Sequence, residues 1–386
     1  MSVVATCDEG YFLSHEEFIV KTYQEINSVP AEPMFNLRTP FMQEAQSSQI
    51  AARMLDPDGQ PPKKKSKKEI IFRKAETDSN QMEKMSEVTL VKERMKAVLE
   101  SARNCGCLNY SATPEDFKDN NSSSRKFSDS VFQVSNIIGS ENSFSGANNS
   151  DCAMKQSIQG ENYVLPSKCR FFCGDLFSLE KFLSEEKFDL LVIDPPWWNK
   201  YIRRRKLADQ ASSYSMMYNK DLAQIPIEKH LAPGALVAIW CTNSQSNINQ
   251  LRDDVMPSWG LDYISTWFWV KVTKSGCTVC DFSVPPGKQP YERILFGRSH
   301  GAESSKNLKN PDGNKVILSV PSAIHSHKPP LIDVLAPFVQ PSPKILELFA
   351  RSLLPNTTSC GLEVLKLQHE ILFKSNEKTL NSKRPE

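Results

Sequence analysis

The sequence lacks the features of secreted, membrane-spanning and zinc-binding proteins. It has no apolar run long enough to cross a bilayer and no amino-terminal signal-peptide pattern, so we expect a soluble intracellular protein. Ten cysteines are present, but Cys277 and Cys280 form one C-x-x-C pair without a second, and Cys105 and Cys107 are one residue apart. We therefore expect no metal and free thiols in a reducing compartment, with structural zinc as the less favoured alternative.

The chain also has little net charge, no internal repeat and no glycine-rich phosphate-binding loop. Its 47 Lys and Arg residues nearly balance 45 Asp and Glu residues, for a formal net charge of +2 over 386 residues. This overall balance hides local basic clusters, so net charge alone does not identify a partner. The missing loop argues against a ligand that is held by its phosphates.

Composition divides the chain into regions of different character. A basic run at 63–68 is typical of a nuclear-import signal or a nucleic-acid patch, so we expect a nuclear protein, with the cytoplasm as a second location. Apolar residues at near-helical spacing predict a helix over 82–104. The expected regions are an accessory region at 1–110, in which short elements of residues 1–60 pack on another part, a flexible Ser- and Asn-rich linker at 111–157, a catalytic domain at 158–372 and a polar tail at 373–386.

The catalytic half alternates between apolar runs and helical periods. We expect strands at 170–172, 190–193, 235–240, 264–272, 293–296 and 345–349, and helices near 220–225, 245–255 and 331–338. This alternation predicts a Rossmann-like α/β fold with a doubly wound, mostly parallel sheet. The aromatic run Trp267-Phe268-Trp269 is interpreted as sheet core rather than as a platform for bases.

The most informative segment is Asp194-Pro195-Pro196-Trp197, which follows the apolar run 190–193. Ligands of α/β proteins bind where strands end, so the segment would present a carboxylate and an indole to a ligand. Asp194 and the carbonyl of Pro195 can accept hydrogen bonds from an exocyclic amine, and Trp197 can cover the face of a base. These groups suit methylation of an adenine amine, which needs positioning and electrostatics rather than a general base. Without the preceding strand, a surface turn with a core Trp would be an equal alternative.

At these residues the sequence resembles the Asp-Pro-Pro-Trp adenine N6-methyltransferase family, which includes the messenger-RNA adenosine methyltransferase. The likeness runs from about residue 162 to residue 368, through NYVLPSK, FDLLVIDPPW, QIPI, PSW, SVPSAIHSHKPPL and LELFAR, with a fainter match in the first 13 residues. It implies a class I S-adenosylmethionine-dependent methyltransferase in the permuted amino-methyltransferase order, because the Asp194 strand precedes the Glu347 strand.

The resemblance implies methylation of adenosine N6 in small nuclear RNA such as U2, including adenosine that is already 2′-O-methylated. DNA adenine is the rival acceptor. Two other classes stay open: an inactive RNA-binding partner subunit, and a nuclear scaffold that works through its amino-terminal region. The retained Asp194, Trp197 and Lys328 favour catalysis.

The resemblance also implies a binding site for S-adenosylmethionine. Asp175 matches the acid that the family uses on the cofactor adenine, with a helix-capping Asp as the alternative. Lys328 matches the lysine that meets the methionine carboxylate, and the segment from Glu347 to Arg351 matches the part beside the ribose. The implied cofactor-binding residues are Asp175, Leu176, Asp194, Lys328, Glu347, Phe349, Arg351 and Glu363, and the implied catalytic residues are Asp194, Pro195, Pro196 and Trp197.

One position departs from the family pattern. Relatives carry a Gly-Asn pair before an acid or amide, whereas this chain reads Gly361-Leu362-Glu363. The departure removes one side-chain hydrogen-bond partner, so a ribose or adenine contact at Leu362 is in doubt and Glu363 remains as a candidate. His325 and His327 are interpreted as residues that orient Lys328, since the reaction needs no imidazole.

The chain after Trp197 predicts the nucleic-acid contact. Basic side chains over phosphates, next to rings that stack on bases, hold a single strand without sequence preference, although a solvated charged loop is the alternative. Tyr214 and Ser215 are expected to close the same pocket, and a duplex would have to present a flipped adenine. We expect RNA rather than DNA as the partner and no obligate protein partner. The predicted nucleic-acid contacts are Trp198, Lys200, Tyr201, Arg203, Arg204, Arg205, Lys206 and Tyr214.

Overall fold

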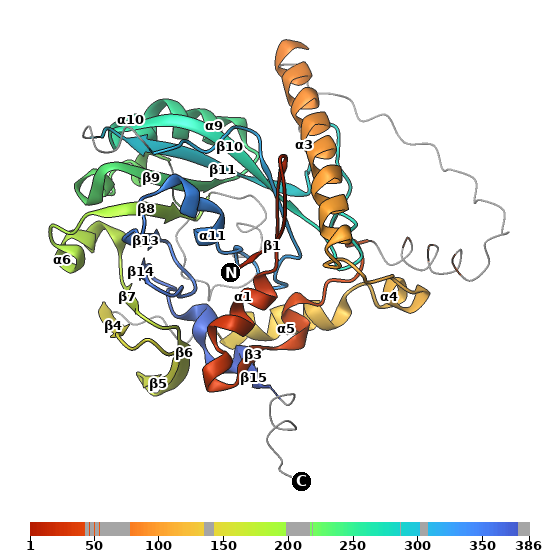
Figure 1. The fold of residues 1–386 in the computed structure, drawn as a ribbon, viewed down its shortest axis with the longest axis horizontal. Helices are drawn as coiled ribbons and strands as arrows, with labels where there is room; N and C mark the ends of the chain where they lie inside the picture. The colour runs from red at the N-terminus through yellow and green to blue at the C-terminus, as the bar shows by residue number, and fades with distance from the viewer. Residues whose placement is uncertain are drawn as a thin grey trace, which may run out of the picture.

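A computed structural model of the chain describes residues 1–42, 46, 50, 54, 78–134, 143–197, 217, 219–285, 287–301 and 308–376. In this part of the chain, 11 strands form one sheet in the order β1-β2-β12-β10-β11-β9-β8-β13-β14-β7-β4 (Figure 1). These strands are β1 (Val3–Cys7), β2 (Gly10–Leu13), β4 (Phe144–Asn148), β7 (Cys169–Cys173), β8 (Phe188–Ile193), β9 (Leu231–Cys241), β10 (Leu261–Lys271), β11 (Tyr291–Ser299), β12 (Val316–Ser319), β13 (Ile345–Leu348) and β14 (Thr357–Cys360).

Helices and two small sheets surround this sheet. The α-helices are α1 (His15–Thr22), α3 (Asp78–Asn104), α4 (Pro114–Asp119), α5 (Ser122–Val134), α6 (Leu179–Leu183), α8 (Asn219–Leu222), α9 (Gln245–Gln250), α10 (Met256–Ser258) and α11 (Ile332–Leu335). The small sheets pair β15 (Phe373–Ser375) with β3 (Ser28–Pro30) and β5 (Met154–Ile158) with β6 (Glu161–Leu165). None of the helices that the structure describes is both long and apolar enough to cross a membrane.

The centre of the sheet is parallel, as predicted. β9, β8, β13, β14 and β7 are neighbours, and each pairs in parallel with the next. From β8 the chain continues to its neighbour β9, whereas from β13 it continues to β14 on the other side. The direction of winding therefore reverses between β8 and β13, and such a reversal creates a ligand crevice at the carboxyl ends of the strands. Both strands on which the site prediction depends are present: β8 ends directly before Asp194, and β13 contains Glu347.

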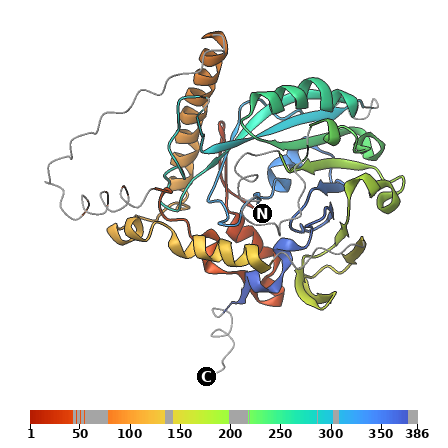
Figure 2. The ribbon, with the colours of Figure 1, turned by 180° about the vertical axis from the view of Figure 1, so that it is seen from behind.

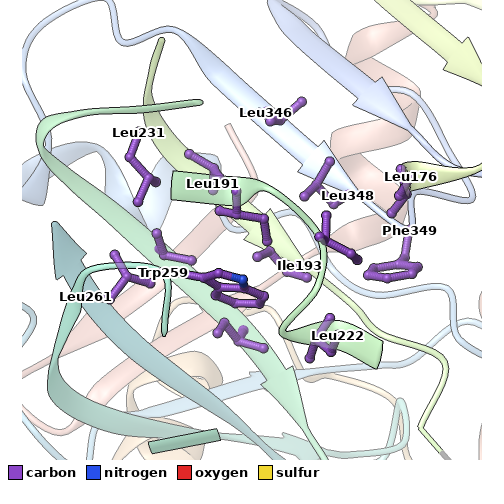
Figure 3. Close-up of a cluster of buried hydrophobic side chains, with 14 of the residues drawn as sticks. Leu176, Leu191, Ile193, Leu222, Leu231, Trp259, Leu261, Leu346, Leu348 and Phe349 are labelled. Atoms are coloured by element: carbon purple, nitrogen blue, oxygen red, sulfur yellow. The ribbon is translucent and has the colours of Figure 1, made fainter. Parts of the chain in front are cut away.

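Both faces of these central strands are buried, which explains their continuous apolar sequences. On one face, Leu191 and Ile193 of β8 and Leu348 of β13 pack with the fully buried Trp259 (Figure 3). On the other face, Leu190 and Val192 pack with Trp240, Trp267, Trp269 and Val334. The interpretation of the aromatic run at 267–269 as sheet core is confirmed, because all three rings are buried.

The amino-terminal region joins the same sheet. β2 pairs in parallel with β12 and in antiparallel with β1, and Val91 and Val98 of α3 pack on these strands. The long helix α3 lies beside β1 in Figure 1. The predicted helix over 82–104 is confirmed, since α3 includes it. The prediction that short elements of residues 1–60 pack on another part is confirmed for the described residues. The basic run at 63–68 lies outside the described residues.

The prediction of a flexible linker at 111–157 is wrong where the structure describes this segment, because it contains α4, α5, β4 and β5. Its Ser and Asn residues are there for a structural reason. Asn120 and Asn121 adopt positive φ, and their side chains bond the backbone of Met42 and Thr39. A domain boundary at 158 is also wrong, because β4 pairs with β7 of the main sheet. Polar residues of this kind cap helices and form turns as readily as they form linkers.

The polar tail does not begin at residue 373, as predicted. Phe373–Ser375 forms β15, which pairs in antiparallel with β3, and Phe373 packs edge-on against Tyr23 with ring centroids 5.3 Å apart. The red amino-terminal elements and the blue end of the chain accordingly lie side by side in Figures 1 and 2. Residues 377–386 lie outside the described part of the chain.

Candidate active site

The carboxyl ends of the parallel strands bring most of the predicted site residues to one edge of the sheet. Asp194 follows β8, Phe349 and Arg351 follow β13, Glu363 follows β14, and Asp175 follows β7. Because β8 and β13 are neighbours, Asp194 and Arg351 lie on opposite sides of the point where the winding reverses. This is the place where α/β sheets bind ligands.

Two cations flank the carboxylate of Asp194. The Nη1 of Arg351 lies 3.0 Å from Oδ2 of Asp194, and the Nζ of Lys328 lies 3.5 Å from Oδ1. The side chains of all three residues are at least 85% buried, since their exposed fractions are 15%, 13% and 15%. Charged partners this close and this well shielded interact more strongly than an exposed ion pair.

The pairs at Asp194 belong to a longer row of alternating charges, which we call the charge chain. Glu292 accepts from Lys328 Nζ at 2.5 Å and also pairs with Lys271. At the other end, Glu363 accepts from Arg351 Nε at 3.2 Å and from Lys366 Nζ at 2.7 Å. The four cations and three carboxylates leave one excess positive charge in this row, which suits an anionic group. In order, the charge chain is Lys271, Glu292, Lys328, Asp194, Arg351, Glu363 and Lys366.

Lys328 is held as a cation in an aromatic setting. Its ammonium lies 5.2 Å from the ring centroid of Trp240 and 5.7 Å from that of Trp269. Burial lowers the pKa of Lys328, but the carboxylates of Asp194 and Glu292 outweigh this effect and raise it above the usual value. The side chain is thus charged at neutral pH and can bind a carboxylate.

Glu347, in contrast to Lys328, is held in its neutral form. Burial is the largest cause that raises its pKa to about 8, and the charge of Asp194 adds to the effect while Arg351 opposes it. The group therefore holds its proton at neutral pH. Among the described residues, neither Glu347 Oε2 nor Oγ of its register neighbour Ser359 has a hydrogen-bond partner. Two buried polar atoms without partners on adjacent strands are places where a ligand hydroxyl or a water can bind.

The turn after β8 is fixed by hydrogen bonds. The amide of Asp194 donates to Leu348 O at 3.3 Å, and the amide of Trp197 donates to Pro195 O at 2.8 Å. The indole Nε1 of Trp197 donates to Trp240 O at 2.9 Å, which sets the orientation of the ring. A carbonyl oxygen has two lone pairs, so Pro195 can accept a further hydrogen bond. The four predicted catalytic residues are thus brought together in one rigid turn.

Asp175 and Leu176 lie at the same edge in structural roles. Oδ1 of Asp175 accepts from the amide of Phe177 at 3.1 Å and caps the short 3-10 helix Leu176–Ser178. Asp175 itself is exposed, so its second carboxylate oxygen can still serve a ligand. Leu176 is only 4% exposed and packs in the core, so only its backbone can reach a ligand.

The loops after β13 and β14 approach each other closely. A Cβ on Gly361 would lie 3.0 Å from both the amide nitrogen and the carbonyl oxygen of Ala350, so this close contact favours a glycine. Phe349 has a φ of 58° and a buried side chain, so its backbone rather than its ring faces the edge. Leu362 is 49% exposed beside this contact, and its carbonyl accepts from Cys173 Sγ at 3.4 Å.

The sequence did not predict three members of the charge chain. Glu292 and Lys271 come from β11 and β10, which meet the site only through sheet pairing, and Lys366 follows β14. The one available signal for Glu292 was a single carboxylate directly before the expected strand at 293–296. The predicted nucleic-acid contacts, Trp198, Lys200, Tyr201, Arg203, Arg204, Arg205, Lys206 and Tyr214, lie outside the described residues.

Comparison with known proteins finds a family and several relatives that are similar to this part of the chain. Residues 188–363 match the MT-A70 family. A human protein named N(6)-adenine-specific methyltransferase METTL4 is 40% identical over 237 residues, which make up 58% of this chain and 48% of that protein. The chain thus matches about half the length of this relative.

Two further relatives differ in how much of the chain they share. A Caenorhabditis elegans protein named DNA N6-methyl methyltransferase is 28% identical over 394 residues, covering 95% of this chain and 98% of that protein. A Cryphonectria parasitica protein named N6-methyladenosine RNA methyltransferase MTA1 is 36% identical over 214 residues, covering 53% of this chain and 62% of that protein. Similarity to the worm protein therefore extends through the amino-terminal region.

Proposed function

We propose that the chain methylates N6 of adenine in nucleic acid with S-adenosylmethionine as the methyl donor, because residues 188–363 match the MT-A70 family. The observation that carries the proposal is the placement of Asp194 between Lys328 and Arg351, at 3.5 Å and 3.0 Å, where the winding of the sheet reverses. The fixed indole of Trp197 lies in the same turn.

The residues at this edge fit S-adenosylmethionine, the methyl donor of MT-A70 methyltransferases. The ammonium of Lys328 would hold the methionine carboxylate, and Arg351 with the unpartnered oxygen of Glu347 would hold the ribose hydroxyls. The lack of a glycine-rich loop is consistent with a ligand that has no phosphate. When bound, the cofactor supplies an electrophilic methyl group.

The chain's own residues would bind and orient the adenine. Asp194 and the carbonyl of Pro195 accept hydrogen bonds from the exocyclic amine, and so hold its nitrogen toward the methyl group. Trp197 covers the base face, a contact worth about 1–3 kcal/mol per stacked base. The methylated amine is acidic enough to lose its proton to water, so the residues supply positioning and charge stabilisation rather than a general base.

RNA is the acceptor that we propose, either as a single strand or with a flipped adenine. The name of the fungal relative as an RNA methyltransferase supports RNA. DNA is the second candidate, because the worm relative named as a DNA methyltransferase aligns with 95% of the chain. We also propose that the chain acts without an obligate protein partner, and that the basic run at 63–68 directs it to the nucleus.

The test is methylation by the purified chain of matched RNA and DNA oligonucleotides that contain a single adenine, with and without a 2′-O-methyl group. Mass spectrometry of the released nucleosides should find N6-methyladenosine in RNA. Asp194→Ala should abolish transfer yet bind S-adenosylhomocysteine within about tenfold of the wild-type affinity, because the amine contact acts mainly in the transition state. Asp262→Ala, at an exposed position, is the control.

Three outcomes would change the proposal. Methylation of DNA alone would support the second candidate. Binding of S-adenosylhomocysteine without transfer to either nucleic acid would support the inactive partner subunit. Full activity of Asp194→Ala would overturn the proposed role of the turn after β8. For the nuclear location, a fluorescent fusion in which the run at 63–68 is replaced by Ala should remain in the cytoplasm, and continued nuclear accumulation would contradict it.

A further inference from the structure

Helix α1 lies against both loops that supply cations to Asp194. The helix begins at His15, directly after β2, and Leu13 at the end of β2 pairs with Ser319 at the end of β12. β12 is parallel to β2, and the chain continues from the end of β12 into the loop 320–331 that carries Lys328, which we call the Lys328 loop. Helix α1 therefore starts at the same edge of the sheet as the site. The serine before it caps the helix, because Ser14 Oγ accepts from the amide of Glu17 at 3.2 Å.

The first contact is made by His15. Its ring lies edge-on to that of His327, with centroids 4.3 Å apart, and Lys328 is the next residue. Phe35 completes the group at 5.0 Å from His15 and 6.0 Å from His327. All three rings are more than 90% buried, with exposed fractions of 4%, 7% and 1%. Edge-to-face ring pairs of this kind hold a defined geometry and add about 0.5–1.5 kcal/mol.

The second contact is made by Tyr23, at the other end of the helix. Its hydroxyl accepts from Gln368 Nε2 at 2.6 Å, and Oε1 of Gln368 accepts from the amide of Leu353 at 3.2 Å. The amide of Leu367 donates to the carbonyl of Arg351 at 2.8 Å. Tyr23 is therefore linked, through the buried Gln368, to the loop that carries Arg351.

Apolar packing joins the two contacts. His15, Ile19 and Tyr23 are spaced four residues apart, so they share one face of α1. Ile19 and Tyr23 belong to a single buried cluster. The cluster also contains Ile324 of the Lys328 loop and Leu367, whose amide donates to the carbonyl of Arg351. One helix face thus packs against both loops at once.

We propose that α1 is a positioning element of the cofactor site. His15 fixes the position of the Lys328 loop, and Tyr23 fixes the position of the loop 349–356 that carries Arg351, which we call the Arg351 loop. The inference rests on the proposed function, in which Lys328 binds the carboxylate end of the ligand and Arg351 the ribose end. If both cations are held in place before binding, fewer side chains and loops have to be ordered when the ligand binds. The entropy cost of binding is therefore lower. Residues 15–23 then belong to the binding site functionally, although they do not touch the ligand.

The test uses the full chain and S-adenosylhomocysteine, with affinity measured by calorimetry. Tyr23→Phe removes one hydroxyl while Gln368 keeps its bond to the carbonyl of Val164. We expect about a three- to tenfold rise in Kd, which corresponds to the loss of one buried hydrogen bond. His15→Ala should raise the Kd by a similar factor, and His15→Phe, which keeps a ring edge against His327, should restore part of the affinity.

A second ligand separates positioning from general destabilisation. 5′-Methylthioadenosine has the adenosine part of the cofactor but no carboxylate. His15→Ala should therefore weaken S-adenosylhomocysteine and leave 5′-methylthioadenosine unchanged, whereas Tyr23→Phe should weaken both. In steady-state kinetics, both variants should raise KM for the methyl donor and leave KM for RNA unchanged. If His15 and Tyr23 had a purely structural role, both variants would weaken the binding of both ligands to the same extent. That result would overturn the inference.

Two controls match these variants. Lys21→Ala changes an exposed residue on the other face of α1, and Ser265→Ala removes a buried hydroxyl that donates to Pro311 O at 2.8 Å, toward the far end of β10. Neither should change either Kd. Wild-type affinity for S-adenosylhomocysteine in Tyr23→Phe or in His15→Ala would overturn the proposed role of that residue. If the wild-type chain itself binds no S-adenosylhomocysteine, the proposed function fails instead.

Discussion

Glu347 is a carboxyl group whose ionisation the fold opposes. Its pKa rises from the ordinary value of 4.5 to about 8, mainly through burial. Between these two pH values the folded protein keeps a proton that the unfolded chain has released. The free energy of unfolding therefore falls as pH rises from about 4.5 to about 8, and this contribution is constant on either side of that window.

We predict that Glu347→Gln removes this loss of stability, because the amide does not ionise. Urea unfolding of the wild-type chain and of the variant at pH 5.5 and pH 8 measures the difference. The free energy of unfolding should fall further for the wild-type chain than for the variant across this interval. At pH 8 the variant should have the higher free energy of unfolding. Equal losses in the two proteins would show that Glu347 does not keep its proton in the folded state.

Glu292 is the shared anion of two lysines. Burial alone would raise its pKa, but Lys328 and Lys271 outweigh burial and hold the pKa well below the usual range. We predict that Glu292→Gln lowers the free energy of unfolding by about 2–4 kcal/mol, because two partly buried ammonium groups lose their common partner. Urea unfolding measures this. Glu180→Gln, which breaks an exposed pair with Lys229, is the control and should unfold like the wild-type chain.

Single residues also show what a sequence can and cannot reveal about a site. The Asp194 to Trp197 turn was predictable because carboxylate, prolines and indole are consecutive and follow a buried strand. Glu292 was not, because its role depends on which residues of β10, β11 and the Lys328 loop face it after the sheet has formed. Asp175 shows a third situation, since the same side chain that caps a short helix keeps one carboxylate oxygen for a ligand.

At the scale of elements, α3 is attached to the sheet by a buried charge. Glu87 pairs with Arg293, whose side chain is only 7% exposed, and accepts from the hydroxyl of Tyr291 at 2.8 Å. Arg293 also donates to Asn243 Oδ1 at 2.6 Å, in the loop that follows β9. The helix is thus linked to the carboxyl end of β9, which is the neighbour of β8 and of the turn that contains Asp194.

We predict that Glu87→Ala destabilises the chain by about 3 kcal/mol, because it leaves the buried guanidinium of Arg293 without its carboxylate. Hydrogen exchange should quicken in α3 more than in β8 or β13. Glu93→Ala, on the exposed side of the same helix, provides the comparison. If both variants unfold at the same urea concentration, the pair does not attach the helix.

Elements with a clear apolar period were predictable, and elements without one were not. β8 and β13 are continuous apolar runs because both faces are buried. β14 reads Thr357-Thr358-Ser359-Cys360, so its burial could not be inferred from hydropathy, although all four residues are buried. Helix α4 of the expected linker begins at a side-chain cap, Thr113, whose hydroxyl and backbone complete a capping box with Asp116.

At the scale of the whole molecule, the predicted catalytic domain is not a separate unit. β2 covers β12, β3 pairs with β15, and β4 covers β7, and all three covering strands lie before residue 158. We predict that a chain of residues 158–372 alone is insoluble or unfolds without cooperativity, because the edges of β12 and β7 lose their partners. Circular dichroism during heating of the full and shortened chains tests this. A cooperative transition in the shortened chain would contradict it.

The order of strands has a consequence for synthesis on the ribosome. β7 and β8 follow each other along the chain, but β13 and β14 lie between them in the sheet. Because domains form from the amino-terminal end as the chain emerges, the facing edge of β8 remains unpaired until residue 348 has been made, and that of β7 until residue 360. The gap between them is the place where Asp194 later meets Arg351. Any nascent chain interrupted before residue 345 therefore carries two open strand edges where the active site should be, and is exposed there to aggregation.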